Sequence, residues 1–151
     1  MSTLFGYTLV AHILLGLVGI GAFYAVWMAL MKRVPKLRFL FWSSLVGLVS
    51  FIASWLSAGY YYVEYYGGAV KPVIKAGAYP WAHLVVMEVK EHLFLFLPIL
   101  AALTFIIFAL LEETAIENQD IKRALAYISG FIVVVGVLIT LGGVMISGAV
   151  R

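Results

Sequence analysis

Four long apolar runs, separated by short polar links, constrain the fold of this chain more than any other feature. They cover about residues 4–31, 39–62, 81–111 and 124–150, and each is long enough to cross a hydrocarbon core, which takes roughly 20 helical residues. Because a chain in lipid must satisfy its own backbone hydrogen bonds, these runs are predicted to be helices. The sequence therefore predicts an all-α integral membrane protein with one domain, residues 1–151, folded as an up-and-down bundle of four transmembrane helices.

The composition excludes a soluble globular domain. The chain is 65% hydrophobic and only 11% charged, whereas soluble domains carry roughly 25% charged residues. It contains no cysteine, which excludes disulfides, thiolate metal sites and covalently attached c-type haem. The sequence shows neither a phosphate-binding glycine loop nor a nucleophile motif, so it does not decide whether the protein is an enzyme. The expected surroundings are a lipid bilayer, and no nucleic-acid partner is expected.

Basic residues are unevenly distributed over the links between the apolar runs. The first and third links hold Lys32, Arg33, Lys36, Arg38, Lys122 and Arg123. The second link holds only Lys71 and Lys75, and Arg151 ends the chain. By the positive-inside rule, the first and third links face the cytoplasm, and both termini face outward with the second link. The expected location is the cytoplasmic membrane of a prokaryote.

The second link, residues 59–80, is expected to form a lid on the outer membrane surface. It is rich in tyrosine, an aromatic residue enriched at the headgroup level of membranes. Gly67, Gly68, Pro72, Gly77 and Pro80 are expected to break it into turns. The third run, 81–111, measures about 46 Å as a helix, well beyond a ~30 Å hydrocarbon core. The third helix is therefore predicted to extend beyond the bilayer on the outer side.

Two histidines are predicted to lie at the same depth in the membrane. His92 precedes Leu111 by 19 residues, and His12 precedes Met31 by 19 residues. At the helical rise per residue, each histidine lies about 28 Å from the inner boundary, close to the outer one. Two histidines at one level on diagonal helices can ligate a single haem iron from both faces. This spacing predicts one b-type haem near the outer face.

Two glycines and two lid lysines fit the same prediction. Gly16 and Gly19 follow His12 by four and seven residues, so they share its helix face and would leave room for a porphyrin ring. Lys71, Lys75 and the lid tyrosines are expected to receive the haem propionates. The small-residue rows of the second and fourth runs have a simpler explanation, which is close packing of helices in lipid.

Acidic residues lie next to the second predicted ligand. Glu88 is four residues from His92 on one helix face, and Glu91 is adjacent to it. Glu88 is expected to orient the His92 ring, as carboxylates do for ligating histidines, and both glutamates are candidate proton acceptors. The same residues support an alternative, in which Glu88, His92 and His12 hold a non-haem transition metal.

The remaining polar residues of this region have less specific roles. Lys90 is expected to form a neutralising pair with Glu91 or Glu64. His83, about 13 Å further out than His92, is the alternative histidine ligand.

The sequence thus favours a membrane-embedded b-type cytochrome with haem b as its cofactor. One haem near the outer face would exchange electrons with quinol or an extracytoplasmic partner. One alternative is a metal-, ion- or proton-handling membrane protein that uses the cluster of Glu88, Glu91 and His92. The other is a non-catalytic subunit or assembly factor of a larger membrane complex. The partners expected from these hypotheses are a quinone, other membrane subunits and a second copy of the chain.

Overall fold

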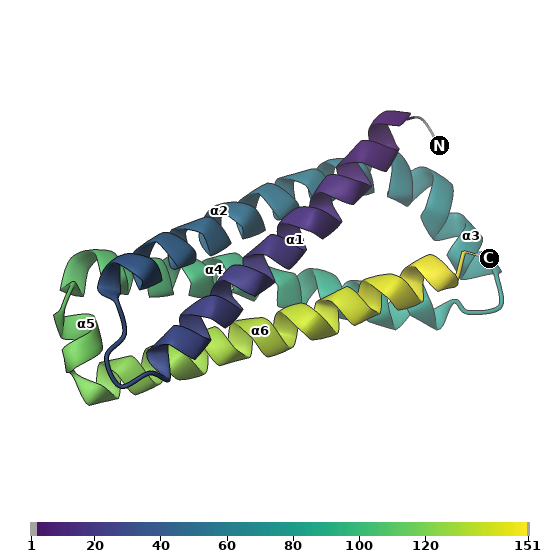
Figure 1. Ribbon diagram of the computed structural model, residues 1–151. Helices are drawn as coiled ribbons and strands as arrows, with labels where there is room; N and C mark the ends of the chain where they lie inside the picture. Colours follow the sequence, from purple (N-terminus) through teal and green to yellow (C-terminus); the bar gives the residue numbers. More distant parts are fainter. Residues whose placement is uncertain (1–2, 151) are drawn as a thin grey trace.

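The computed structural model describes residues 3–150, and this part of the chain contains helices and no strand (Figure 1). The elements are α1 (Thr3–Leu30), α2 (Leu37–Tyr61), η1 (Tyr62–Val70), α3 (Lys71–Ala76), η2 (Ala82–Met87), α4 (Glu88–Leu111), α5 (Thr114–Glu117) and α6 (Gln119–Gly148), where η denotes a π-helix. Four helical segments are long and apolar enough to cross a membrane: Thr3–Leu30, Leu37–Ala76, Ala82–Leu111 and Gln119–Gly148. The prediction of an all-helical chain with four such helices is confirmed.

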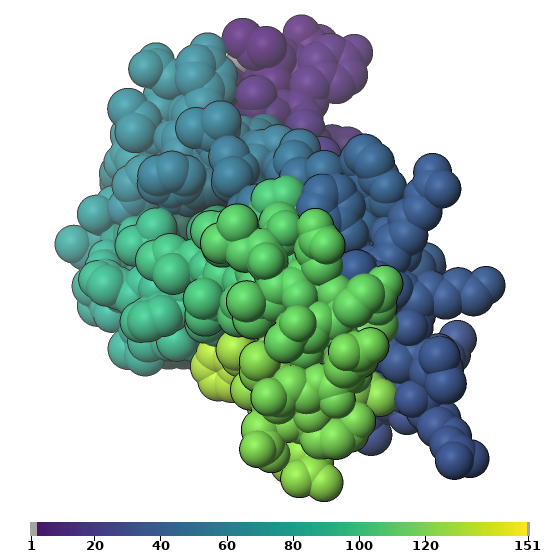
Figure 2. Space-filling view, turned by 90° about the vertical axis from the view of Figure 1, so that its left-hand side faces the viewer, coloured from purple at the N-terminus to yellow at the C-terminus, as the bar shows by residue number. Residues whose placement is uncertain are grey.

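The four long helices lie side by side, and the chain reverses direction between them (Figure 1). α1 packs against α2 and α6, and α4 packs against the same two helices, so α1 and α4 are diagonal. One end of the molecule carries η1, α3 and η2 beside the start of α1 and the end of α6; we call it the lid end. Figure 2 views the opposite end, where α5 and the start of α6, in green, lie beside the link that follows α1, in blue.

Away from the lid end, large side chains fill the space beside the glycines. A Cβ atom on Gly19 of α1 would come within 2.6 Å of the Phe51 ring, and one on Gly47 of α2 within 2.5 Å of the Phe23 ring. The two rings stack with their centroids 5.9 Å apart. Gly136 of α6 is covered in the same way, because its Cβ would lie 2.6 Å from Ile20. These glycines allow the close helix approach that the small-residue rows predict.

The second helix does not end at its glycines. α2 continues through η1 and α3 to Ala76, so the turns expected at Gly67, Gly68 and Pro72 are wrong. The π-helix η1 contains both glycines and continues the helix with backbone hydrogen bonds of the i→i+5 type. Pro72 lies at the start of α3 but inside this continuous helical segment, so its missing N–H removes one backbone hydrogen bond there. The turn expected at Gly77 and Pro80 is confirmed, because the helix ends at Ala76 and residues 77–80 are not helical.

The fourth helix begins five residues earlier than predicted, at Gln119. The Asn118 side chain accepts hydrogen bonds from the backbone N–H groups of Asp120 and Ile121, at 3.0 and 3.2 Å. This cap satisfies donors that would otherwise be free at the helix start. Part of the polar link read as a loop is therefore the first turn of α6.

Candidate functional site

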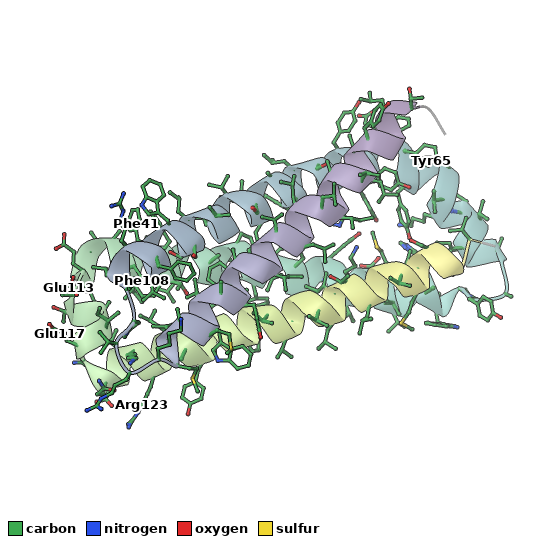
Figure 3. The ribbon with its side chains drawn as sticks, in the orientation of Figure 1. Phe41, Tyr65, Phe108, Glu113, Glu117 and Arg123 are labelled. Atoms are coloured by element: carbon green, nitrogen blue, oxygen red, sulfur yellow. The ribbon has the colours of Figure 1, made fainter. Side chains whose placement is uncertain are left out.

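A cavity of about 540 Å³ lies between the four long helices at the lid end. This volume falls within the roughly 300–1,000 Å³ typical of small-molecule sites. Most of the lining is apolar, and α1, α2, α4 and α6 contribute His12, Ser54, Lys90 and Thr140, respectively. Tyrosines of α2 and η1 line it as well, and Figure 3 labels one of them, Tyr65, at the lid end.

The cavity exists because α1 and α6 separate toward the lid end (Figure 1). The two helices touch where Ile20 covers Gly136. Two turns further along α6, Gly143 faces Lys90 of α4 instead of a residue of α1. The separated helices line the cavity from both sides, α1 with Leu9, His12 and Ile13 and α6 with Gly143 and Ser147.

His12 is held by Ser54 in a defined tautomer. Its Nδ1 lies 2.8 Å from Ser54 Oγ and 3.1 Å from the Ser54 carbonyl oxygen. Ser54 Oγ donates its one hydrogen to the His12 carbonyl oxygen, at 2.9 Å. Nδ1 must therefore be the donor to Ser54, and in the neutral ring Nε2 carries the lone pair. An imidazole fixed in this way is prepared to bind a metal or a proton through Nε2.

Lys90 brings a positive charge to the cavity wall. A Cβ on Gly143 would lie 3.7 Å from Lys90 Nζ, which places the ammonium group between α4 and α6. Within residues 3–150, no carboxylate lies within 4.0 Å of Nζ, so the expected pairs with Glu91 and Glu64 are not formed. A cation in largely apolar surroundings is costly without a counter-charge, which favours a ligand that carries an anionic group.

His92 lies on the other side of α4. Its side chain is exposed and does not line the cavity, and its Nδ1 donates to the Glu88 carbonyl oxygen at 2.6 Å. Two residues correspond to about 200° around an α-helix, so His92 and Lys90 occupy nearly opposite faces. The structure brings His12 to the cavity but does not bring His92 there. The predicted pair of histidines across one iron is not assembled.

The carboxylates also differ from their expected contacts. The Glu88 carboxylate does not hold His92; its Oε1 lies 3.9 Å from Nε2 of His83. Glu91 Oε1 is buried and has no hydrogen-bond partner among the described residues. Glu64 is exposed on η1. Over residues 3–150, no three His, Asp or Glu side chains form a group that could hold a metal ion, so the mixed carboxylate and imidazole site is not assembled.

The two glycines predicted to flank a ring have different surroundings. Gly16 lines the cavity, and a Cβ there would make ordinary contact with Ser54 Oγ at 3.5 Å. Gly19 is covered by Phe51 and serves helix packing. Only Gly16 therefore borders the site.

The inward position of Lys90 could have been found from the sequence. The buried residues of α4 follow a helical spacing of three or four: Phe94, Leu97, Ala101, Thr104 and Phe108. The same spacing extended backward reaches Lys90 and then Met87, and both line the cavity. Depth alone selected His92, because a depth argument ignores which face of the helix a residue occupies.

No protein-family profile matches the chain, and no curated protein or solved structure shows significant similarity to it. The geometry of the cavity therefore carries the functional argument alone.

Proposed function

We propose that the protein is an up-and-down bundle of four transmembrane helices whose lid-end cavity holds one b-type haem, with His12 as the histidine ligand. The observation that carries this proposal is the state of His12. Its ring borders a cavity of about 540 Å³, and hydrogen bonds to Ser54 leave Nε2 for a ligand. The basic link after α1 lies at the opposite end, so the lid end faces outward by the positive-inside rule.

The residues of the cavity fit the chemical demands of a haem. The macrocycle needs apolar walls, which Phe94, Leu97 and Ile139 provide. The iron needs a histidine in a fixed tautomer, which Ser54 enforces on His12. The acidic groups of a haem need a cation, and Lys90 presents one without a described counter-ion. A bound haem supplies one-electron redox chemistry; the chain orients it, excludes water and balances its charge.

The proposed activity is electron transfer at the outer face of the membrane. A single haem at the lid end lies close to one surface only, so its donor and acceptor must both approach that surface. Quinol within the outer leaflet and an extracytoplasmic redox protein are the partners that fit this position.

The test is an absorption spectrum of the detergent-purified full-length chain, oxidised and then reduced with dithionite. The proposal predicts a b-type α-band on reduction and one haem per chain in a pyridine haemochrome assay. Haem is added to the purified protein as a second arm, which covers incomplete loading in cells. A colourless preparation that takes up no added haem would overturn the proposal.

A further inference from the structure

Three polar side chains connect the cavity with the surface of the lid end. Tyr66 of η1 lines the cavity and is 3% exposed. Its hydroxyl group lies 3.2 Å from Nδ1 of His83, which is 1% exposed. Nε2 of His83 lies 3.9 Å from Oε1 of Glu88, whose side chain is 48% exposed. This row of three side chains begins at the cavity wall, continues through a buried imidazole and ends at a carboxylate that is exposed to water.

The π-helix η2 brings the side chains of His83 and Glu88 to the same side of the helix. His83 and Glu88 are five residues apart; His83 lies in η2, which ends at Met87, directly before Glu88. In an α-helix a separation of five residues corresponds to about 140° of rotation, which would direct the two side chains apart. In a π-helix residues i and i+5 lie on the same side. Insertions of this kind are frequent at functional sites, and this one brings Nε2 toward Glu88.

The hydrogen positions follow from the chemistry of the partners. A tyrosine hydroxyl group that donates to Nδ1 requires the neutral imidazole to carry its hydrogen on Nε2. That hydrogen then points toward Glu88, and an ionised carboxylate can only accept. The 3.9 Å separation exceeds a hydrogen bond, so proton transfer from Nε2 requires the half-exposed Glu88 side chain to rotate toward it.

The surroundings of His83 contain charged groups from two elements. They are Lys71 and Lys75 of α3 and Glu88 of α4. From η1 the neighbour is Tyr66, and the cluster beside it contains the apolar residues Ile146 of α6 and Ala149, which follows that helix. Glu88 is therefore the one carboxylate among these groups, and it is the acceptor toward which a proton on His83 is drawn.

We propose that Tyr66, His83 and Glu88 form a proton relay between the cavity and the water outside the lid end. The Tyr66 hydroxyl group passes its proton to Nδ1, and Nε2 passes its own proton to the Glu88 carboxylate, which releases it to water. Tyr66 regains a proton from the cavity. One proton enters and one leaves. The reverse sequence, in which Glu88 returns a proton to Nε2 and Nδ1 returns one to Tyr66, restores the starting tautomer, so the relay exchanges protons in both directions. The relay requires the cavity but does not depend on haem, so it stands apart from the proposed function.

The test follows proton exchange at the imidazoles by ¹⁵N NMR of the haem-free full chain in lipid nanodiscs. The chain has three histidines, so each signal is assigned by single substitutions. His12 reports on the cavity and His83 on the middle of the relay. Exchange rates are obtained from line widths while the external pH is varied.

The relay predicts a different pattern for each substitution. Glu88→Gln slows exchange at both His83 and His12, by about tenfold or more, because it removes the outer acceptor. Tyr66→Phe slows exchange at His12 alone, since His83 keeps its path to water. Glu88→Asp, which keeps a carboxylate, restores part of the rate.

The matched controls are Tyr65→Phe and Glu64→Gln. Tyr65 lines the same cavity from the same π-helix but stacks on Phe5, and Glu64 is exposed beside it. Both controls leave the two exchange rates unchanged. Two results would overturn the relay: an unchanged rate at His12 in Tyr66→Phe, or equal slowing by Tyr65→Phe. Amide spectra verify that each variant is folded, and Tyr66→Phe removes only one oxygen.

Discussion

The two halves of the molecule are built from the same four helices, but their glycines have different roles. Away from the lid end, Gly19 and Gly47 are covered by the rings of Phe51 and Phe23, and the helices are in close contact. Toward the lid end, Gly16 and Gly143 border a cavity of about 540 Å³. Small residues thus serve helix packing at Gly19 and Gly47 and border the cavity at Gly16 and Gly143.

Side-chain hydrogen bonds between the long helices are found at the lid end, although Thr140 and Ser147 there bond within α6. In the closely packed half, the hydroxyl of Ser44 bonds to a carbonyl oxygen of its own helix, Phe41, and that of Thr104 bonds in the same way to Leu100. At the lid end, His12 bonds to another helix and keeps one ring nitrogen for the cavity. The predictions below test whether this difference reflects a binding site or only looser packing.

Filling the cavity should have the largest effect. In Gly16→Leu the new side chain enters the space beside His12, so we expect complete loss of haem, measured as haem per purified chain. Stability should not fall, because the Cβ makes only an ordinary contact with Ser54 and the rest of the side chain enters the cavity. The control is Gly21→Leu on the same helix, where no atom lies within 4 Å of the Cβ position; it should retain haem. Haem loss in both variants would remove the distinction between the two faces of α1.

Removing the cavity cation should weaken binding of acidic ligands. Hydrogen bonds to charged groups contribute about 1.5–3 kcal/mol, so the wild type should prefer haem over haem dimethyl ester by about tenfold or more. Lys90→Met should reduce this preference to about one while the ester still binds. The measurement is a spectrophotometric titration with each compound. Lys75→Met, at an exposed position of α3, should keep the preference, and an unchanged preference in Lys90→Met would contradict the assigned role.

Alanine at glycine positions should separate the two halves by stability. Gly47→Ala forces a methyl group against the buried Phe23 ring and should cost about 1–3 kcal/mol. Gly143→Ala makes only ordinary contact with Lys90 and should leave stability unchanged or raise it slightly. Thermal unfolding in detergent, followed by circular dichroism, measures both. Equal destabilisation would show that the lid end is packed as closely as the other half.

The sequence predicts the long apolar helices well, because hydrophobic length is a one-dimensional property, although the second continues to Ala76 instead of ending at residue 62. The first predicted helix, residues 4–31, is found at Thr3–Leu30, and the third, 81–111, at Ala82–Leu111. The expected close packing of Gly47 and Gly136 also appears, since small residues four apart share a helix face.

The candidate site was only partly predictable because it depends on rotation about the helix axis. The depth of His92 follows from a constant rise per residue, but its direction changes by about 100° with every residue. The π-helix η2 precedes α4 and shifts the register of the residues before it relative to those after it. The spacing of apolar residues in 81–92 does not reveal that shift. The sequence therefore identified His12 as a site residue but predicted His83 only as an alternative ligand.

The central claim, that His12 is the histidine that holds a haem, is tested most directly by reduced-minus-oxidised spectra of His12→Ala and His92→Ala purified side by side. Our account predicts that His12→Ala loses the b-type α-band, whereas His92→Ala keeps it at wild-type intensity per chain. A spectrum that survives in His12→Ala, or that disappears in His92→Ala, would contradict it.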